Sequence, residues 1–545
     1  MMRPRPSEDD RPVLVLGPNP TPNGGMHLGH MAGPYLAGDI YARYQRARGR
    51  NVIFTTGTDD SQTFVVASAR RQGTSPEELC RTATEEIREA LVAIGISFDG
   101  FGPFDDTYQA TVLDFFRTLH AAGKFELKTV KMPYLERTGE FLVEGLIEGD
   151  CPVCLSTCRG GLCETCCHPN NFDELINPHS TIDRNDIPDV REVSILVLPM
   201  EEYREQLTAY HEAWAPYRRP HLVQMIRDVL SRPLKDLPIT YPLDWGIPAP
   251  FPETPGQVLN AWLELMPAGM YTTSYAARNL GIDTKPGELW QAGGNLRWVH
   301  FLGFDNAYFF TMTHIALLMA HGDTYMLPEW ICTNEFYELE SEKFSTSKRH
   351  VLSVQDALGE VPRDVLRLYL ALTAPEHQRT NFSRAGLEKV TDERLLGPWN
   401  QLAGRLGKAV ANATSGDAPL PVSAAARSRA ATMMERFDTV FEMPWYSPNR
   451  CADMVLVQVE RLRREAAALD GQGIDDVPEA WGDVLLQVKA LLALSSPILI
   501  DLAAAATEAG ALDGLTGTLV QGAFDVTEVK PFTPPLLPCE PVNVP

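Results

Sequence analysis

The sequence predicts an α/β fold in which a Rossmann-like parallel sheet carries a zinc-knuckle insert and is followed by a C-terminal α-helical bundle. Three observations lead to this prediction. Val13–Leu16 is a continuous apolar run, as expected for a strand buried on both faces of a parallel sheet. Two Cys-x2-Cys pairs stand near residue 151, and beyond about residue 380 the apolar residues recur at helical spacing.

A turn containing Gly24 and Gly25 follows the first strand, and His27 and His30 then enter the first turn of a helix. The permissive glycine backbone suits the close approach of a phosphate. The helix N-terminus offers free N–H groups, and two imidazoles can donate hydrogen bonds to a phosphate under attack. The alternative interpretation is a pair of surface histidines on an ordinary helix.

Residues 39–49 have the apolar spacing of an amphipathic helix, and residues 52–60 read as a second strand that ends in acidic residues. Together with the first strand they predict a βαβ unit. The end of the second strand would carry Asp59 into the crevice where open α/β sheets bind ligands. A carboxylate there can hold an ammonium group, although a helix cap or a turn would also explain this aspartate.

The strongest spacing signal in the chain is the pair of Cys-x2-Cys motifs formed by Cys151, Cys154, Cys163 and Cys166. Four thiolates at this spacing suit tetrahedral zinc, and the two glycines between the pairs let the chain fold back. Disulfides are the competing explanation. We favour zinc, because the chain shows no secretory segment and is large enough to need no covalent staples.

Several stretches in this order resemble the class I aminoacyl-tRNA synthetases, and the methionyl-tRNA synthetases most closely. HLGH at 27–30 resembles the HIGH signature, and VIFTTGTDD at 52–60 resembles the second strand with its acidic turn. The other matching stretches are WGIP at 245–248, WLELMPAGMY at 262–271, which resembles WLDAPIGY, FLGFD at 301–305, which resembles FIGKD, and KFSTSK at 343–348, which resembles the KMSKS loop.

The resemblance implies ATP, Mg²⁺ and Zn²⁺ as cofactors and a set of site residues. The implied catalytic residues are His27, His30, Lys343 and Lys348; the implied ATP-binding residues are Gly24, Gly29, Gly303 and Asp305; the implied amino-acid-binding residues are Asn19, Asp59, Trp262, Met270 and Phe310. The zinc insert is implied to position the acceptor end of a tRNA. In isolation, the 343–348 stretch would read as a solvated loop.

This chain departs from the family pattern at several of these positions. Thr346 stands where the second lysine of the KMSKS loop is expected, and Lys348 or Arg349 would have to replace it. Asn19 replaces an apolar residue, Met270 takes the place of a tyrosine, and Phe310 replaces a histidine. These exchanges predict a rebuilt amino-acid pocket that admits methionine or a related or altered side chain.

From the resemblance and the composition shifts we divide the chain into five parts. Residues 1–123 and 238–330 are the two halves of the catalytic domain, 124–237 the insert with the zinc knuckle at 151–166, 331–380 the KMSKS-like loop with the stem-contact region, and 381–545 a helical domain that resembles the anticodon-binding domain. A length of 545 residues agrees with several domains, since one core rarely exceeds roughly 300 residues.

Net charge and hydropathy limit the kinds of partner and the location that we expect for this protein. The net charge of −23 offers no general attraction for a polyanion, and the arginine clusters at 43–50 and 461–464 are either basic patches or solvated helix faces. The polar N-terminus lacks the apolar segment of a secretory signal. The apolar tract 490–507 contains serines, a proline and an aspartate, which predict a buried helix pair and no membrane span. We expect a cytoplasmic protein.

Three functions are compatible with the sequence. In the first, ATP and an amino acid form an aminoacyl adenylate, and a tRNA takes the acyl group. In the second, a specialised paralogue keeps the adenylate step and passes the acyl group to a small-molecule amine or amide. In the third, the chain is a tRNA-binding regulator without chemistry. We favour the first, because the histidine pair, Asp59 and the zinc insert are all present.

Overall fold

The computed structural model describes residues 9–344, 350–512, 519 and 522–541, and its centre is a five-stranded parallel sheet. The strands stand in the order β14–β13–β1–β2–β3. Because the chain adds strands first on one side of β1 and later on the other, the order reverses beside β1, where such sheets open a ligand crevice. The strands are β1 (Val13–Leu16), β2 (Val52–Gly57), β3 (Gly100–Gly102), β13 (Arg297–Gly303) and β14 (Trp330–Asn334).

Strand β1 is buried on both faces, as its apolar run predicts. Val13 and Val15 point into the hydrophobic core shared with the C-terminal helices, whereas Leu14 and Leu16 point into a second core on the opposite face. The pleat alternates side chains between the two faces, so a strand between two cores must be apolar throughout. The predicted α/β fold with a parallel sheet is confirmed.

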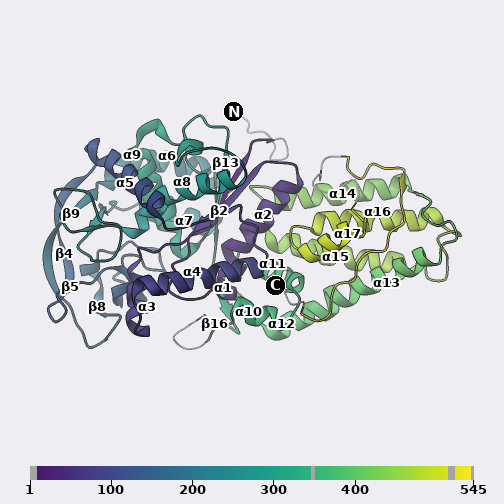
Figure 1. Cartoon of the computed structure of the whole chain (residues 1–545), viewed down its shortest axis with the longest axis horizontal. Helices are drawn as coiled ribbons and strands as arrows, with labels where there is room; N and C mark the ends of the chain where they lie inside the picture. Colours follow the sequence, from purple (N-terminus) through teal and green to yellow (C-terminus); the bar gives the residue numbers. More distant parts are fainter. Residues whose placement is uncertain (1–8, 345–349, 513–518, 520–521, 542–545) are drawn as a thin grey trace.

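Helices of the α/β half cover both faces of the sheet (Figure 1). Helix α2 carries the amphipathic pattern of residues 39–49 and packs on the face toward the C-terminal helices, while α8 packs on the opposite face. The helices of this half are α1 (Leu28–His30), α2 (Leu36–Ala47), α3 (Thr63–Gln72), α4 (Pro76–Ala93), α5 (Asp106–Ala121), α8 (Ala261–Asn279) and α9 (His314–Ala320).

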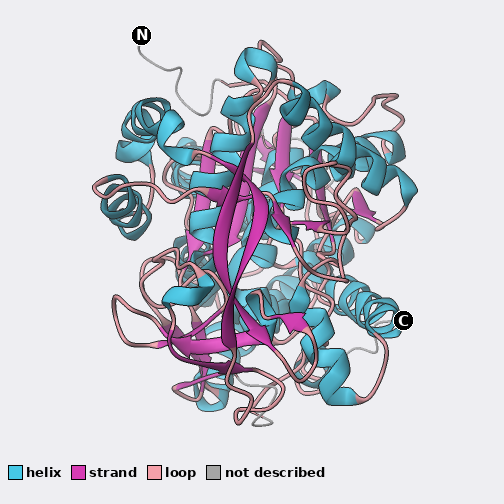
Figure 2. Cartoon of the chain, turned by 90° about the vertical axis from the view of Figure 1, so that its left-hand side faces the viewer, coloured by secondary structure: helices cyan, strands magenta, loops and turns pink. Residues whose placement is uncertain are grey.

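The insert between the two halves is built from antiparallel sheets. Strands β4 and β9 form a long twisted ribbon that lies in the foreground of Figure 2. The first sheet has the order β10–β9–β4–β5, and the smaller one the order β7–β6–β8. The insert contains β4 (Glu126–Leu135), β5 (Glu140–Phe141), β6 (Ile147–Asp150), β7 (Thr157–Arg159), β8 (Ile176–Ser180), β9 (Asp189–Leu198), α6 (Arg204–Trp214), α7 (Pro220–Leu230) and β10 (Leu237–Pro238).

The region after the parallel sheet contains two separate helices, over 354–358 and 363–372. They do not form one helix because Pro362 stands between them. This region and its neighbours contain α10 (Val354–Leu358), α11 (Arg363–Leu372) and the short strands β11 (Thr240–Tyr241), β12 (Val258–Leu259), β15 (Tyr337–Leu339), β16 (Glu342–Lys343), β17 (Thr380–Phe382), β18 (Leu420–Pro421) and β19 (Glu528–Val529).

The C-terminal part is the predicted helical bundle. The apolar tract 490–507 is indeed a helix pair, since one helix ends at Ser495 and the next begins at Ile500. The helices are α12 (Arg384–Lys389), α13 (Gly397–Ala411), α14 (Ala424–Phe441), α15 (Pro448–Ala467), α16 (Pro478–Ser495) and α17 (Ile500–Glu508).

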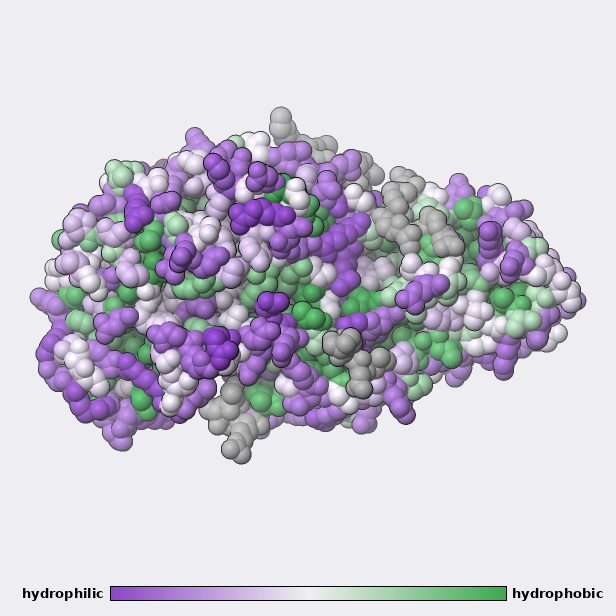
Figure 3. All heavy atoms as spheres, in the orientation of Figure 1, coloured by the Kyte–Doolittle hydropathy of each residue, from purple (hydrophilic) through white to green (hydrophobic). Residues whose placement is uncertain are grey.

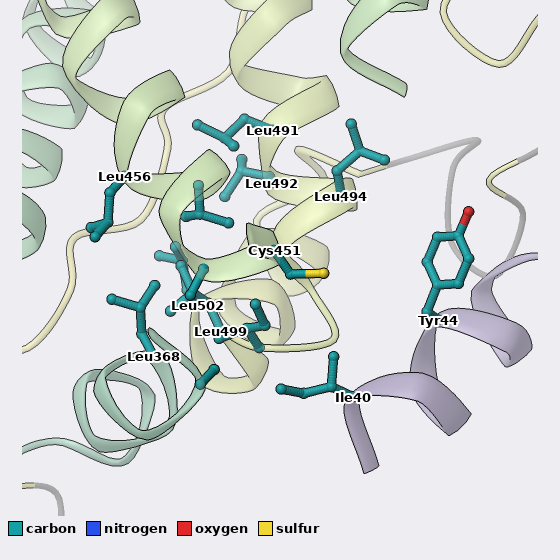
Figure 4. Packing of buried hydrophobic residues seen from close by; sticks show 14 of the residues in the cluster. Ile40, Tyr44, Leu368, Cys451, Leu456, Leu491, Leu492, Leu494, Leu499 and Leu502 are labelled. Carbon is teal, nitrogen blue, oxygen red and sulfur yellow. The ribbon is translucent and has the colours of Figure 1, made fainter. Parts of the chain in front are cut away.

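One hydrophobic core continues from the parallel sheet into the bundle. Figure 4 shows Ile40 and Tyr44 of α2 on one side of a group of buried leucines that includes Leu499 and Leu368 of α11, and all four belong to the same buried cluster. The bundle is therefore packed onto the α/β half by apolar contact. The face seen in Figure 3 is mostly hydrophilic, with small scattered groups of hydrophobic residues. Within the described ranges, no helix is both long enough and apolar enough to cross a membrane.

Candidate active site

His27 and His30 lie directly after the turn that follows β1. His27 is the N-cap of α1, and its Nδ1 accepts the backbone N–H of Gly29 at 3.1 Å. The backbone N–H of His27 in turn donates to Nδ1 of His30 at 3.2 Å, and the two rings stack with their centres 3.9 Å apart. Burial and the neighbouring His30 ring lower the pKa of His27. We therefore assign its proton to Nε2, which leaves this N–H to donate outward.

Phe344, from far along the chain, lies against the histidine pair. The ring of Phe344 stacks on His27 with 4.4 Å between ring centres and an angle of 5°. Lys343 lies in β16, and its Nζ is 2.8 Å from the Glu164 carboxylate of the insert. The side chain of Lys343 is 70% exposed, so this ion pair adds little stability and leaves the ammonium free to move. Lys348, Thr346 and Arg349 lie outside the described residues.

The end of β13 brings Gly303 and Asp305 toward the same place. A Cβ on Gly303 would collide with the carboxylate of Asp305, so a side chain there would displace this carboxylate. Burial, followed by the charge of Glu164, raises the pKa of Asp305 to about 6. A Cβ on Gly29 would stand 2.9 Å from the His27 ring, whereas Gly24 faces open space. The glycine loop, the histidines and Asp305 thus surround the carboxyl ends of β1 and β13.

Asp59 stands just beyond β2, and it is almost fully buried. Its Oδ1 has no hydrogen-bond partner among the described residues. Burial, followed by the nearby carboxylate of Glu264, raises the pKa of Asp59 well above its ordinary value. Asn19 lies beside it, because its side-chain Nδ2 is 3.5 Å from the backbone oxygen of Thr58. An unpartnered buried carboxylate of this kind suits a cationic ligand.

Glu264 is a site residue that our reading of the sequence missed. It is fully buried on α8, its Oε1 accepts the hydroxyl of Tyr108 at 3.2 Å, and its Oε2 has no partner in the described part of the chain. Burial raises the pKa of Glu264 to about 8. The available signal was its place in WLELMPAGMY, where it matches the acidic residue of WLDAPIGY.

Trp262 and Phe310, the two aromatic residues expected in the amino-acid pocket, stack or pack on different partners. Trp262 stacks on Phe309, with ring centres 4.2 Å apart and an angle of 7°. Phe310 packs edge-on against His300 and His314 instead. Since neighbouring helical residues point about 100° apart, only one of two adjacent phenylalanines can face Trp262.

Met270 and Tyr271 point in different directions from α8. A Cβ on Gly287 would stand 3.4 Å from Sδ of Met270, which is buried in the core on this face of the sheet. The hydroxyl of Tyr271 donates to Asp105 at 2.7 Å, so this tyrosine is held by the N-cap of α5. The amino-acid-binding roles of Met270, Phe310, Asn19 and Trp262 stay predictions.

The four predicted zinc ligands form a compact cluster. The Sγ atoms of Cys151, Cys154, Cys163 and Cys166 all lie within 4.8 Å of one another. The sulfurs of Cys151 and Cys166 are 3.8 Å apart, and those of Cys154 and Cys163 are 3.6 Å apart. Four Zn–S bonds of about 2.3 Å in a tetrahedron need sulfurs about 3.8 Å apart. All four are free thiols, so this geometry fits zinc and not disulfides.

The knuckle is packed against the nucleotide side of the crevice. The thiol of Cys167, directly after the last zinc ligand, lies 3.7 Å from the backbone oxygen of Phe304, next to Asp305. Glu164, within the second cysteine pair, reaches Lys343. The insert thus contacts both the end of β13 and the 343–348 stretch.

Ion pairs within the chain surround both arginine clusters, so neither is an open basic patch. The arginines at 461–464 pair with glutamates of their own helix, and the side chain of Arg464 is 75% exposed, as expected for a solvated helix face. Each member that makes an ion pair does so with an acidic residue of the same chain. The pairs are Arg43–Asp39, Arg46–Asp99, Arg48–Asp438, Arg50–Glu442, Arg461–Glu465, Arg463–Glu460 and Arg464–Glu460. Their charge is largely cancelled inside the molecule.

Comparisons with known proteins agree with this architecture. The family model of the class I tRNA synthetases (M) matches residues 13–406. The methionine–tRNA ligase of Salinibacter ruber is 33% identical over 407 residues, which cover 72% of this chain and 56% of that protein. The ligase of Thermomicrobium roseum is 30% identical over 454 residues, covering 83% of this chain and 76% of that protein. The chain thus spans little more than half the length of the first relative.

A solved structure has the same fold over nearly the whole chain. Mycobacterium tuberculosis methionyl-tRNA synthetase bound by methionyl-adenylate superposes with a TM-score of 0.73 at 20% identity, covering 97% of this chain and 99% of that one. The overall fold is therefore shared. Since the family model matches well over half of its residues, the chain belongs to the class I tRNA synthetases (M).

Proposed function

We propose that this protein activates methionine with ATP and transfers the methionyl group to tRNA. The observation that carries the proposal is the placement of the His27 and His30 pair at the helix start after β1, with Phe344 stacked on His27 and Lys343 next to Phe344 in the chain. Because the relatives are named methionine–tRNA ligases, we assign tRNA as the acceptor in preference to a small-molecule amine or amide. The reaction would take place in the cytoplasm.

In the first step a carboxylate oxygen of the amino acid attacks the α-phosphorus of ATP. The bond from that phosphorus to the bridging oxygen breaks, pyrophosphate leaves, and the aminoacyl adenylate remains. His27 and His30 would donate N–H groups to the phosphate oxygens, and Lys343, with Lys348, would neutralise the departing pyrophosphate. Gly24, Gly29 and Gly303 would admit the nucleotide, and Asp305 would accept ribose hydroxyls. Mg²⁺ would be held by the phosphates.

The amino acid would be oriented by its ammonium group. Asp59 has the unpartnered oxygen that an ammonium needs, and Glu264 supplies a second carboxyl group behind it. Trp262, Asn19, Met270 and Phe310 are the residues we assign to the surroundings of the side chain. In the second step, a hydroxyl of the terminal tRNA ribose attacks the acyl carbon and AMP leaves.

Zinc, when bound by the four cysteines, would supply structure and no chemistry. The thiolates would hold the knuckle against Phe304 and Asp305, where it can guide the acceptor end of the tRNA. We keep the five-part division of the chain as part of this proposal, with 381–545 as the region that would meet the rest of the tRNA.

The test is ATP–pyrophosphate exchange across the standard amino acids, followed by charging of total tRNA with the active one. We expect exchange with methionine and formation of methionyl-tRNA. His27→Asn keeps an acceptor for the N-cap but loses the imidazole N–H, and should lower kcat by about 10²- to 10³-fold. Adenylate formation without tRNA charging would reject the assigned acceptor, and no exchange with any amino acid would reject the proposal.

A further inference from the structure

Phe344 is a buried aromatic residue whose ring completes a stack of three rings at the start of α1. His30 and His27 stack with their ring centres 3.9 Å apart and an angle of 22°, and His27 and Phe344 stack with their ring centres 4.4 Å apart and an angle of 5°. Two parallel rings at these distances do not fit side by side on one face of an imidazole, so His30 and Phe344 lie on opposite faces of His27. The plane of the His27 ring is therefore fixed from both sides.

The direction of the His27 ring within this plane is fixed as well. Its Nδ1 accepts the backbone N–H of Gly29 at 3.1 Å, which leaves Nε2 as the remaining donor of the neutral ring. A Cβ on Gly29 would stand 2.9 Å from the His27 ring and 3.1 Å from the Phe344 ring, so this glycine lets both rings pack here. The plane of the ring and the bond at Nδ1 together determine where the Nε2–H points.

The hairpin that leads to Phe344 is anchored in its sheet, although its turn contains no glycine. Glu340 and Ser341, between β15 and β16, have φ values of 47° and 69°, a left-handed conformation that costs free energy in residues with side chains. The neighbouring strand β17 holds this turn. The backbone N–H of Ser341 donates to the side-chain oxygen of Asn381 at 2.6 Å, and that of Glu340 donates to the backbone oxygen of Phe382 at 2.9 Å.

A second segment, at 352–353, contacts the same helix start through its backbone. The N–H of Leu28 donates to the backbone oxygen of Leu352 at 3.1 Å, and His27 pairs with Ser353 in an antiparallel bridge. These contacts fix the main chain at His27, whereas the stacking with Phe344 acts on its side chain. An imidazole rotates about two side-chain bonds, so the main chain alone does not set the plane of the ring.

We propose that Phe344 is a positioning residue that holds the His27 imidazole in the plane from which Nε2 donates to the phosphate. A flat aromatic ring suits this role because it covers a whole face of the imidazole, whereas an aliphatic side chain touches only part of that face. The inference rests on the proposed function, because that function supplies the phosphate that His27 is assigned to bind.

The first test is pyrophosphate exchange by Phe344→Leu. Leucine keeps an apolar side chain but cannot stack, so His27 spends less time in the donating orientation. We expect kcat to fall about tenfold, with KM for the amino acid within about twofold, because the lost alignment acts on the transition state. In a His27→Asn background, Phe344→Leu should cause no further fall in kcat, since the ring that it positions is gone.

Phe382→Leu is the matched control for this exchange experiment. Phe382 lies in β17 of the same sheet, and its buried ring packs edge-on against Tyr369 at 5.5 Å. The same substitution therefore loosens the sheet without touching the stack on His27, and kcat should stay within about twofold of wild type. An equal loss of kcat in the two variants would assign the effect to the packing of the sheet and overturn the role of Phe344.

The second test reads the contact by NMR without turnover. In protein labelled with ¹³C at Cε1 of its histidines, the His27 signal is identified by its absence from His27→Asn. The ring current of Phe344 acts on this signal, so it should move in Phe344→Leu and stay in place in Phe382→Leu. The signals of His300 and His314, which pack on Phe310, should stay in place in both variants and show that the fold is intact.

The two proposals fail in different ways. Absence of exchange with any amino acid in the wild type would reject the proposed function, while the NMR experiment would still decide whether Phe344 holds the His27 ring. If the wild type exchanges but Phe344→Leu keeps its kcat, or if the His27 signal does not move, Phe344 is not a positioning residue. A further tenfold fall in the His27→Asn background would also overturn the role of Phe344.

Discussion

The crevice at the end of the parallel sheet and the helical bundle treat their buried polar groups differently. After β2 and on α8, buried atoms without partners gather in Asp59, Asp60, Ser61, Gln62 and Glu264. Among the described residues of 381–541, the only such atom is Oγ1 of Thr391. Buried polar groups in folded proteins are nearly always paired, so this run of unpaired atoms at the end of the sheet is one that a polar ligand would satisfy.

The bundle, in contrast, pairs polar side chains of α13 within the chain. The amide of Asn400 exchanges two hydrogen bonds with the backbone of Leu537, at 2.9 and 3.0 Å, and Trp399 donates to the backbone of Pro535. Arg405 pairs with Asp470. The buried polar atoms of the bundle find their partners within the chain, whereas those at the end of the parallel sheet leave partners to be supplied by a ligand.

The largest effect expected from this contrast concerns the four facing thiols. Replacing Cys151 and Cys154 by serine should reduce bound zinc from about one equivalent to none, because structural zinc contributes about 10 to 16 kcal/mol in isolated zinc-finger peptides. Metal analysis of the purified protein measures this directly. Cys539→Ser is the control, since this exposed cysteine lies far from the cluster and should leave the zinc content unchanged. A double variant that retains zinc would show that the cluster is not the site.

The next prediction concerns a buried arginine that pairs with groups from distant segments of the chain. Arg367 is fully buried, pairs with Asp39 at 2.6 Å, and donates to the backbone oxygens of Ile94 and Ile498. Arg367→Met leaves the two backbone oxygens unpaired and leaves Asp39 with Arg43 as its remaining ionic partner, and it should lower the free energy of unfolding by about 3 to 5 kcal/mol. Urea denaturation measures the loss.

Arg394→Met is the matched control for this prediction. Arg394 pairs with Asp453 at 2.9 Å, but both side chains are largely exposed to water. Its loss should cost about 1 kcal/mol at most, because exposed ion pairs are screened and entropically costly to hold. Equal losses in the two variants would mean that burial does not distinguish the two pairs.

At the end of the parallel sheet we expect a loss of activity without a loss of stability. Asp59→Asn should lower kcat/KM for the amino acid by about 10²-fold, because the ammonium loses its charged partner. It should leave the free energy of unfolding unchanged or higher, since burial holds the pKa of Asp59 above its ordinary value and the buried carboxyl is itself a cost. Exchange kinetics and urea denaturation of the same preparation give both numbers.

Asp99→Asn is the control for this prediction, because Asp99 stands directly before β3 of the same sheet. Asp99 pairs with Arg46 at 2.8 Å and accepts the backbone N–H of Phe54 at 2.7 Å, so it is satisfied within the chain. It should lose stability and retain exchange. If Asp59→Asn instead destabilised the protein as much as Asp99→Asn, Asp59 would have a structural role.

The elements that the sequence predicted correctly are those whose cause is local. The apolar run of β1, the amphipathic spacing of α2 and the polar break between α16 and α17 each specify a structure within a few residues. The Cys-x2-Cys spacing likewise determines most of the geometry of the cysteine cluster. The break at Pro362 was also local, and the rule for residues preceding proline would have found it.

The remaining features depend on contacts between distant segments. Which of Phe309 and Phe310 faces Trp262 depends on how their helical turn is rotated against α8, a matter of tertiary packing. The left-handed backbone at Glu144 is held only when the insert folds over the chain that leaves Asp59. The arginines at 43–50 looked like one basic surface, but their acidic partners come from as far away as Asp438 and Glu442.

The last effect is a pH dependence of stability caused by Glu264. Burial raises its pKa from 4.5 to about 8, so between these values the unfolded chain has lost a proton that the folded chain still binds. The free energy of unfolding therefore falls as pH rises from about 4.5 to about 8, by up to about 1.4 kcal/mol per pH unit. Glu264→Gln removes this slope and should become progressively more stable than wild type across that window.

Helix α11 provides the counterpart at Asp364, whose pKa burial raises only to about 6. Its carboxylate accepts the backbone N–H groups of Leu502 at 2.8 Å and Asp501 at 3.1 Å, which favour the charged form. Asp364→Asn offers only one acceptor and should therefore lower the unfolding free energy at pH 7.5, where Glu264→Gln raises it. Urea denaturation at several pH values separates the two. Parallel curves for wild type and Glu264→Gln would mean that Glu264 is already ionised in the folded protein and has a cationic partner.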